Sequence, residues 1–378
     1  MSLPYVVASC GMSLAACLDD GREARLVLSH PADLERVDAL RASCDAILVG
    51  AHTIRRDNPR LVVRAPGLVG ARQDAGRPPQ PIKATVTASG DLDAARAFFT
   101  EGPAERVVYV AGEAARIAPG VRRLATVVAM PPGATLRRGV GGLEPRGGGR
   151  LLVEGGARVL TAVLSEDLVD ELQVAIAPYF LAQPGAVRVV GEAPMPFGPG
   201  RRMPVRRVSQ VGDMVVAVYQ LRGAAAPTTL ARDDDRRWLA DAVALSRRCP
   251  PSVSAFSVGA IVVGEGEVVA TGYSREESPV EHAEETAIRR AWAAGLDLSR
   301  CTIYSSLEPC ASRASGRTAC CDRIAAAGVR RVVFASVEPP IFVPGRGAER
   351  LRALGIEVRQ IDDLAAEVRA VNAHLPWR

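Results

Sequence analysis

Short, almost wholly apolar segments separated by helical patterns constrain the fold of this chain more than any other feature. A segment that is apolar at every position has no face for water, so it predicts a strand that is buried on both sides. Segments of this kind or close to it occur at residues 4–9, 46–49, 107–111, 125–129, 151–153 and 171–178, with helical patterns at 32–42 and 157–164. The alternation predicts an α/β domain with a largely parallel sheet covered by helices on both faces.

A segment of small residues divides the chain. The 378 residues are too many for one ordinary core, and residues 223–232 follow a strand pattern at 214–221 and contain few large apolar side chains. We therefore predict a first domain at residues 1–222, a linker at 223–232 and a second domain at 233–378. The second domain also alternates, with helical patterns at 236–248, 281–294, 320–327 and 363–373 and strand patterns at 258–263, 268–273, 302–306, 331–335 and 356–359.

Three stretches fall outside this regular pattern. Residues 65–80 and 133–149 have loop-like composition, and we expect them to form long surface loops. The acidic run at residues 233–235 suits the first turn of the following helix, where carboxylates complement the helix dipole. A solvated surface patch explains the same run equally well.

Composition excludes several classes of protein. Apolar content is 48% and no run of about 18 apolar residues occurs, so we expect no membrane span. The first residues lack a basic region before their apolar stretch, and eight cysteines without an export signal favour reduced thiols in the cytoplasm. The net charge of +5 comes almost wholly from arginine, and aromatic content is 4%, which argues against nucleic-acid binding. Scattered arginines suit phosphorylated small molecules better.

One group of residues carries a metal-binding pattern. His282 and Glu284 lie in a His-Ala-Glu run, Cys310 follows Glu-Pro, and Cys320 and Cys321 are adjacent. Hydrolytic zinc deaminases use one imidazole, two thiolates and a carboxylate that is not a ligand, in this order. The pattern predicts His282, Cys310 and Cys320 as zinc ligands and Glu284 as the catalytic proton shuttle, although Cys321 competes with Cys320 for the third place.

The same region resembles a known family. Leu-Glu-Pro-Cys at 307–310, Gly-Arg-Thr-Ala-Cys-Cys-Asp at 316–322 and Ala-Ala-Gly-Val-Arg-Arg-Val-Val at 326–333 are similar to the deaminase of riboflavin biosynthesis, as is Val-Pro-Gly-Arg-Gly at 343–347. The resemblance implies a cytidine-deaminase-like three-layer α/β/α domain. It also implies a phosphorylated pyrimidine substrate, 2,5-diamino-6-ribosylamino-4(3H)-pyrimidinone 5′-phosphate, and it makes Arg317 a substrate-binding residue.

The chain departs from that family at three places. Thr286 and Ala287 stand where the family has a second histidine, and the stretch 311–315 is longer than in the family and has no histidine. An Asn-Pro pair is replaced within residues 255–257. These differences leave an alternative open, in which the chain is a diverged copy from a specialised pathway that deaminates a related aminopyrimidine or nucleoside.

The first domain resembles the reductase of the same pathway, which has a dihydrofolate-reductase-like fold. The similar residues lie at 42–53, 57–61, 152–156 and 168–172. Glycines that leave a strand and open a helix let the backbone approach a pyrophosphate. The resemblance implies NADPH as the cofactor, with Gly50, Thr53, Gly155 and Gly156 in its site.

The resemblance also assigns Asp57 and Glu154 to the substrate, although a loop cap and a solvated carboxylate at a strand end are the open alternatives for them.

Together these observations predict a bifunctional riboflavin-pathway enzyme with its domains in reversed order, the reductase first and the zinc-dependent deaminase second. In the rival interpretation the reductase-like half is altered or serves as a structural or binding module. We expect a homo-oligomer, a dimer or larger.

Overall fold

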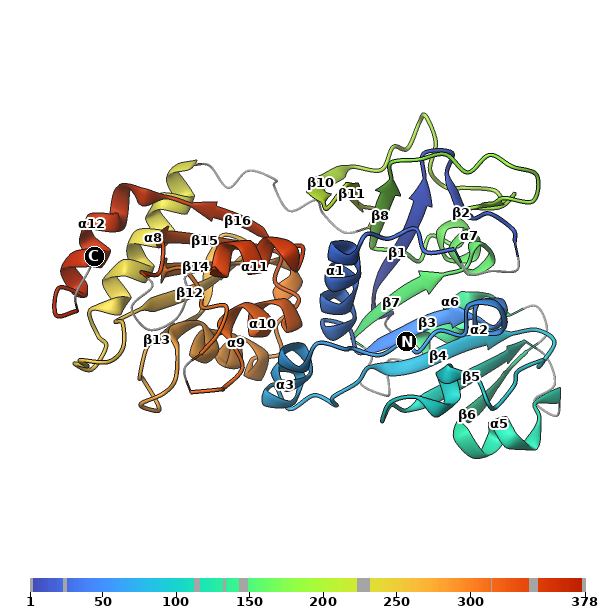
Figure 1. The fold of residues 1–378 in the computed structure, drawn as a ribbon, viewed down its shortest axis with the longest axis horizontal. Helices are drawn as coiled ribbons and strands as arrows, with labels where there is room; N and C mark the ends of the chain where they lie inside the picture. The colour runs from blue at the N-terminus through green and yellow to red at the C-terminus, as the bar shows by residue number, and fades with distance from the viewer. Residues whose placement is uncertain are drawn as a thin grey trace. The chain divides into compact units, whose positions relative to one another are not determined.

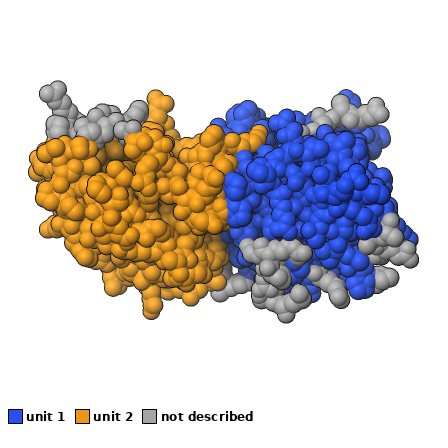
Figure 2. All heavy atoms as spheres, turned by 90° about the horizontal axis from the view of Figure 1, so that it is seen from below, with its two compact units in different colours: residues 1–63, 78–225 blue, residues 64–77, 226–378 orange. Residues whose placement is uncertain are grey.

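The computed structural model describes residues 3–22, 26–111, 116–131, 134–142, 149–222, 232–313, 315–339 and 346–375. It divides into two compact units, coloured separately in Figure 2: residues 1–63 with 78–225, and residues 64–77 with 226–378. The predicted linker, residues 223–232, lies outside the described residues except for its last position, and part of the predicted loop at 133–149 does so too. The domain limits 1–222 and 233–378 stay a prediction, and the grouping of residues 64–77 with the second unit was not expected from the sequence.

A nine-stranded sheet forms the first unit (Figure 1). Its order is β10 (Val205–Val211), β11 (Met214–Gln220), β8 (Glu171–Ala177), β1 (Tyr5–Ser13), β7 (Arg150–Gly155), β3 (Ala46–Gly50), β4 (Ile82–Thr87), β5 (Arg106–Ala111) and β6 (Thr126–Met130). All pairs from β8 to β6 are parallel, and β11 and β10 add an antiparallel edge. The predicted parallel sheet is confirmed.

Both faces of this sheet are buried. Neighbouring strand residues such as Val6 and Val7 belong to different apolar clusters, because successive side chains of a strand point to opposite faces. One cluster includes residues of α7 (Ala157–Ser165) and α6 (Leu136–Gly141). The other includes residues of α1 (Pro31–Ala42), α2 (Ala51–Asp57), α4 (Ala97–Thr100) and α5 (Pro119–Leu124). This double cover explains why the central strands contain runs that are apolar at every position, such as residues 46–49 of β3 and 151–153 of β7.

The second unit is built on a five-stranded sheet. Its order is β13 (Glu267–Tyr273), β12 (Gly259–Gly264), β14 (Cys301–Leu307), β15 (Arg331–Ser336) and β16 (Glu357–Gln360). The first two pairings are antiparallel and the last two are parallel. Its helices are α8 (Arg232–Ser246), α9 (Ala283–Ala293), α10 (Cys320–Ala326), α11 (Gly347–Ala353) and α12 (Ala365–Val371), with short 3-10 turns at Leu298–Arg300 and Asp362–Leu364.

Two glycines let helices approach this sheet from opposite sides. A Cβ atom on Gly259 would lie 2.2 Å from the carbonyl oxygen of Ala242 in α8. A Cβ atom on Gly272 would lie 2.5 Å from the carbonyl oxygen of Ala283 in α9. Because Gly272 pairs with Ala260, the residue after Gly259, the two glycines point to opposite faces, so the sheet is the middle of three layers.

Three sequence expectations are wrong. The loop expected at residues 65–80 contains α3 (Pro66–Asp74), and the loop expected at 133–149 contains α6. The acidic run at 233–235 is no solvated patch at Asp235. The Asp235 carboxylate is fully buried, accepts from Tyr304 Oη at 2.8 Å and pairs with Arg331 at 2.7 Å and with Arg359. Helices and strands that the sequence did not indicate are α2, α3, α4, α5, α6, α11, β4, β10 and the two-stranded pair β2 (Cys17–Asp19) and β9 (Val187–Arg188).

All eight cysteines are free thiols, as the reduced state requires. Among the described residues, no helix is long and apolar enough to cross a membrane.

Candidate functional site

Three side chains from three elements converge in the second unit. His282 is the N-cap residue of α9, Cys310 follows the end of β14, and Cys320 is the first residue of α10. Their ligand atoms all lie within 4.8 Å of one another, and His282 Nδ1 is 3.6 Å from Cys310 Sγ and 3.5 Å from Cys320 Sγ. The structure therefore brings together the three residues that the sequence motif selected as zinc ligands.

The two thiols of this cluster differ in acidity. A hydrogen bond from Cys310 and the positive charges of His282 and Arg313 hold the pKa of Cys320 well below its ordinary value, against the effect of burial. The same hydrogen bond raises the pKa of Cys310 well above its ordinary value. The backbone N–H of Cys320 also donates to Cys310 Sγ at 3.4 Å. The cluster thus places two cysteine sulfurs beside an imidazole, which is a donor set that suits Zn²⁺.

Cys321 points away from this cluster. Its thiol donates to the carbonyl oxygens of Pro309 at 3.3 Å and Gly347 at 3.4 Å. Burial raises the pKa of Cys321 well above its ordinary value. The geometry therefore favours Cys320 over Cys321 as the third ligand.

Glu284 lies beside the three candidate ligands and is buried. Its Oε1 accepts a hydrogen bond from Ser305 Oγ at 2.7 Å, and its Oε2 is 3.3 Å from Cys320 Sγ. Burial, followed by the nearby Cys320 thiolate, raises the pKa of Glu284 to about 8. A carboxyl group with this pKa exchanges protons near neutral pH, as a general acid–base group must.

The site opens into a cavity of about 240 Å³. His282, Glu284 and Cys310 line it together with several groups that the sequence reasoning did not single out, among them Ser254, Phe256, Glu281, Arg313 and Glu338. Burial and the charges of Cys320 and Glu308 raise the pKa of Glu338 to about 8. No sequence signal marked Arg313 or Glu338, because neither belongs to a ligand motif.

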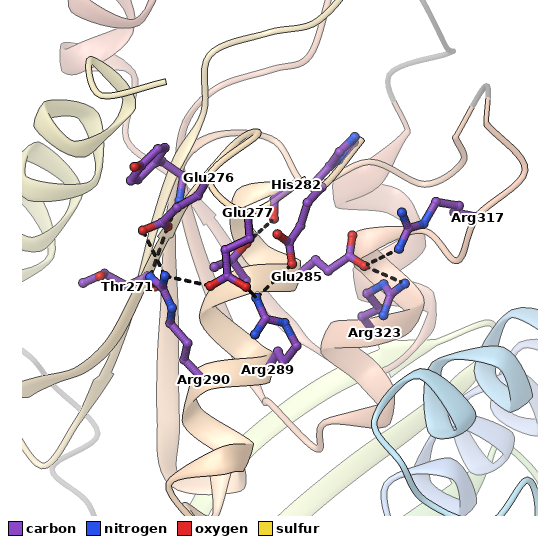
Figure 3. A network of polar contacts seen from close by, with 12 residues as sticks. Thr271, Glu276, Glu277, His282, Glu285, Arg289, Arg290, Arg317 and Arg323 are labelled. Atoms are coloured by element: carbon purple, nitrogen blue, oxygen red, sulfur yellow. Dashed lines mark hydrogen bonds and ion pairs between the residues drawn. The ribbon is translucent and has the colours of Figure 1, made fainter. Parts of the chain in front are cut away.

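Arg317, the predicted substrate-binding residue, belongs to an ionic cluster beside the site. Its guanidinium donates to Glu285 Oε1 at 3.2 Å, and 43% of its side chain is exposed. Figure 3 shows the Glu285 carboxylate facing Arg317 and Arg323. A second network in the same view joins the loop after β13 to α9, where Arg290 binds Glu276, Glu277 and the carbonyl oxygen of Thr271. That network fixes the chain that leads into His282.

The predicted cofactor-binding residues of the first unit also come together. β3 and β7 are parallel neighbours in which Val49 pairs with Gly155, so Gly50 and Gly156 follow at adjacent strand ends. Gly156 is the N-cap residue of α7 at φ 25°, and a Cβ atom there would lie 2.8 Å from Thr53 Oγ1. Two strand ends and two helix starts thus lie together, and the free backbone N–H groups at a helix start can bind a phosphate.

The two acidic residues predicted for substrate binding occupy different settings. Glu154, near the end of β7, forms a bidentate ion pair with Arg41 of α1, with both N–O distances 2.6 Å. Its carboxylate is largely buried, so the alternative of a solvated carboxylate at a strand end is wrong. Asp57 is the last residue of α2, before Asn58 in the left-handed region. The sequence analysis did not indicate Arg41 as the partner of Glu154.

Comparison with known proteins assigns both halves of the chain. The family described as RibD C-terminal domain matches residues 4–217, and the cytidine and deoxycytidylate deaminase zinc-binding region matches residues 232–336. The domain that this family description places at the C-terminus therefore comes first here, and the predicted reversed order is confirmed. The expected dihydrofolate-reductase-like and cytidine-deaminase-like folds are confirmed with it.

Individual relatives cover one half each. The diaminohydroxyphosphoribosylamino-pyrimidine deaminase of Schizosaccharomyces pombe is 39% identical over 137 residues, 35% of this chain and 33% of that protein. The 2,5-diamino-6-ribosylamino-4(3H)-pyrimidinone 5′-phosphate reductase of Methanothermobacter thermautotrophicus is 30% identical over 226 residues, 58% of this chain and 99% of that protein.

Among solved structures, a pyrimidine reductase-like protein from Corynebacterium diphtheriae matches with a TM-score of 0.50 and 23% identity. The match covers 58% of this chain and 92% of that one, and it shows the fold of the first unit. The chain belongs to the RibD C-terminal domain family, and it carries a cytidine and deoxycytidylate deaminase zinc-binding region behind that domain.

Proposed function

We propose that this chain is a bifunctional enzyme of riboflavin biosynthesis. Its second unit deaminates 2,5-diamino-6-ribosylamino-4(3H)-pyrimidinone 5′-phosphate hydrolytically, and its first unit reduces the ribosyl group with NADPH. The observation that carries the proposal is the convergence of His282, Cys310 and Cys320 within 4.8 Å beside the buried carboxyl group of Glu284. The names of the two relatives support the same substrate for both halves.

The residues present fit a catalytic zinc ion. Three protein ligands of nitrogen and sulfur type leave a further position open, as catalytic zinc sites do. His282, Cys310 and Cys320 would hold the ion, and the first two line the cavity. When bound, zinc acts as a Lewis acid and makes water nucleophilic at neutral pH.

Glu284 would move the protons of the deamination. The hydrogen bond from Ser305 fixes Oε1, so Oε2 is the atom that faces the candidate ligands. In the proposed reaction, Oε2 accepts a proton from the attacking water and delivers it to the departing amino nitrogen. A buried carboxyl group placed between the water and the departing nitrogen can hold that proton between the two transfers.

Arg317 would contact the substrate phosphate. Only part of its guanidinium is used by Glu285, and the side chain is 43% exposed, so further N–H donors remain accessible. An arginine can bind a phosphate through two parallel hydrogen bonds. The exposed position suits the charged end of a substrate whose base enters the cavity.

The first unit fits a dinucleotide phosphate at its paired strand ends. Gly156 starts α7 at φ 25°, a backbone conformation that glycine adopts more readily than other residues. Gly50, Thr53, Gly155 and Gly156 would bind NADPH, which supplies the hydride when bound. Asp57 and Glu154 would contact the ribosyl group, with Arg41 fixing the orientation of the Glu154 carboxylate.

The test is incubation of the full chain with the pathway pyrimidine, with and without NADPH, followed by mass spectrometry. We expect replacement of an amino group by oxygen in both reactions and a gain of two hydrogens only with NADPH. Glu284→Gln should keep its zinc and lose ammonia release by at least about 100-fold, the size of a general acid–base contribution. Cys310→Ala should lose zinc as measured by metal analysis. No conversion of this pyrimidine by zinc-loaded protein would overturn the substrate and favour the specialised-pathway alternative.

We also propose that the enzyme is a cytoplasmic homo-oligomer that acts on small phosphorylated molecules. Light scattering of the purified full chain tests the assembly, and a mass of one chain would contradict it.

A further inference from the structure

An arginine that belongs to no ligand motif lies against the candidate zinc ligands. Arg313 comes from the stretch between Cys310 and Cys320, and only 2% of its side chain is exposed. One terminal nitrogen of its guanidinium donates to Cys320 Sγ at 3.5 Å, and the other donates to Glu285 Oε2 at 2.8 Å. Arg313 therefore connects the sulfur of one candidate ligand to the helix that carries His282 and Glu284.

The carboxylate at the other end of this connection is held firmly. Glu285 is the residue after Glu284 in α9, and it also pairs with Arg323 of α10 at 3.0 Å and with Arg317 at 3.2 Å (Figure 3). Arg323 in turn pairs with Asp74 of α3 at 2.7 Å. A buried arginine whose partner is fixed in this way has little freedom to leave Cys320.

We propose that Arg313 is a positioning residue for Cys320: it donates to the sulfur and, through Glu285, sets the thiolate in register with His282 on α9. The proposal rests on the proposed zinc site. Groups that hydrogen-bond to metal ligands orient them, and their loss costs about 10- to 100-fold in metal affinity. Charge-assisted donors also draw electron density from the sulfur.

The test compares Arg313→Gln with the matched variant Arg317→Gln in the full chain. Both arginines bind Glu285, but only Arg313 reaches Cys320, so loss of an ion pair is common to both variants and loss of the sulfur contact is not. The first measurement is zinc affinity by competition with a chromogenic chelator. The second is the thiolate-to-cobalt charge-transfer band of protein loaded with Co²⁺.

We expect Arg313→Gln to weaken zinc binding by about 10- to 100-fold and to move the charge-transfer band to longer wavelength, because the sulfur becomes more electron-rich. Arg317→Gln should change neither. Arg313→Lys keeps the charge but cannot bridge both partners in the same way, so it should restore only part of the zinc affinity. This variant replaces Arg313→Gln in the experiment if the glutamine variant does not fold.

The two possible failures can be told apart. If wild-type protein shows no thiolate-to-cobalt band, the proposed zinc site itself is wrong. If wild-type protein shows the band and Arg313→Gln keeps both its wavelength and the zinc affinity, the site stands and the role of Arg313 is overturned.

Discussion

Glu338 shows how burial changes the behaviour of a single residue at this site. It follows β15, lines the same cavity as His282 and Glu284, and is 9% exposed. Burial is the largest cause of its raised pKa of about 8, and the negative charges of Cys320 and Glu308 add to it. The folded protein therefore keeps a proton on Glu338 at pH values where the unfolded chain has lost it.

This shift predicts a pH-dependent effect of Glu338→Gln in protein kept free of metal by a chelator. The folded-state pKa of Glu338 exceeds the ordinary value of about 4.5. The contribution of this carboxyl group to the stability of the fold is therefore complete below pH 4.5 and is lost as the pH rises to about 8. Glutamine mimics the protonated group and escapes this loss. We measure the free energy of unfolding of both proteins in urea. Between pH 4.5 and 8, the value for the variant should rise by about 2–4 kcal/mol relative to the value for wild type.

The exposed residue Glu267, for which the same substitution removes a solvated carboxylate, provides the control. Glu267→Gln should track wild type across this pH range. An equal gain in both variants would show that net charge, and not the buried site, is responsible.

At the scale of secondary-structure elements, the position of α9 depends on the absence of a side chain at Gly272. A Cβ atom there would lie 2.5 Å from the Ala283 carbonyl oxygen and 2.7 Å from the Ala287 nitrogen. These are backbone atoms of α9, so the clash cannot be relieved by a side-chain rotation. The first turn of α9 carries His282 and Glu284, so any displacement reaches the candidate zinc site.

Gly272→Val should therefore destabilise the second unit by about 3 kcal/mol, at the upper end of overpacking effects, and weaken zinc binding as well. Gly200→Ala is the control, because a Cβ atom at Gly200 meets nothing within 4 Å. Denaturant unfolding and chelator competition measure the two effects. Normal zinc affinity in a folded Gly272→Val variant would show that α9 can move without disturbing its ligand.

The elements that the sequence predicted are those whose own pattern carries the signal. The buried strands β3, β5 and β7 each contain a run that is apolar at every position, at residues 46–49, 107–111 and 151–153, and that pattern needs no knowledge of the partner strands. α3 was missed because Gly67 and Gly70 give it low helix propensity, and its support comes from α10, far along the chain. Local composition cannot reveal a helix that depends on packing.

Prediction of the candidate site from the sequence has the same limit, because local sequence does not reveal contacts that form only in the fold. Spacing alone was enough to predict His282, Glu284, Cys310 and Cys320, since the chemistry of zinc deaminases fixes both the residue types and their order. Spacing could not predict Arg313 or the Arg41–Glu154 pair, because an arginine has no preferred sequence spacing relative to the atom that it contacts in the fold. Asp235 was placed correctly in a first helical turn, but the three partners of its buried carboxylate lie some 70 to 125 residues away.

At the scale of the whole molecule, the two units have separate apolar cores and separate candidate ligands. The core of the second unit is built from residues such as Trp238, Ile261 and Tyr304, none of which belongs to the clusters on the nine-stranded sheet. A ligand that binds one folded unit stabilises that unit by mass action. Zinc and NADPH should therefore raise the midpoints of different unfolding transitions.

The three tryptophans allow the two transitions to be separated, because all of them, Trp238, Trp292 and Trp377, lie in the second half of the chain. Tryptophan fluorescence then follows the second unit alone, whereas calorimetry follows both. Removing zinc with a chelator should lower the fluorescence midpoint by about 10 °C, corresponding to about 4 kcal/mol of lost binding energy. NADPH should raise a calorimetric transition and leave the fluorescence midpoint in place. Cys310→Ala protein should not respond to the chelator, and an equal NADPH shift in both signals would show that the units unfold together.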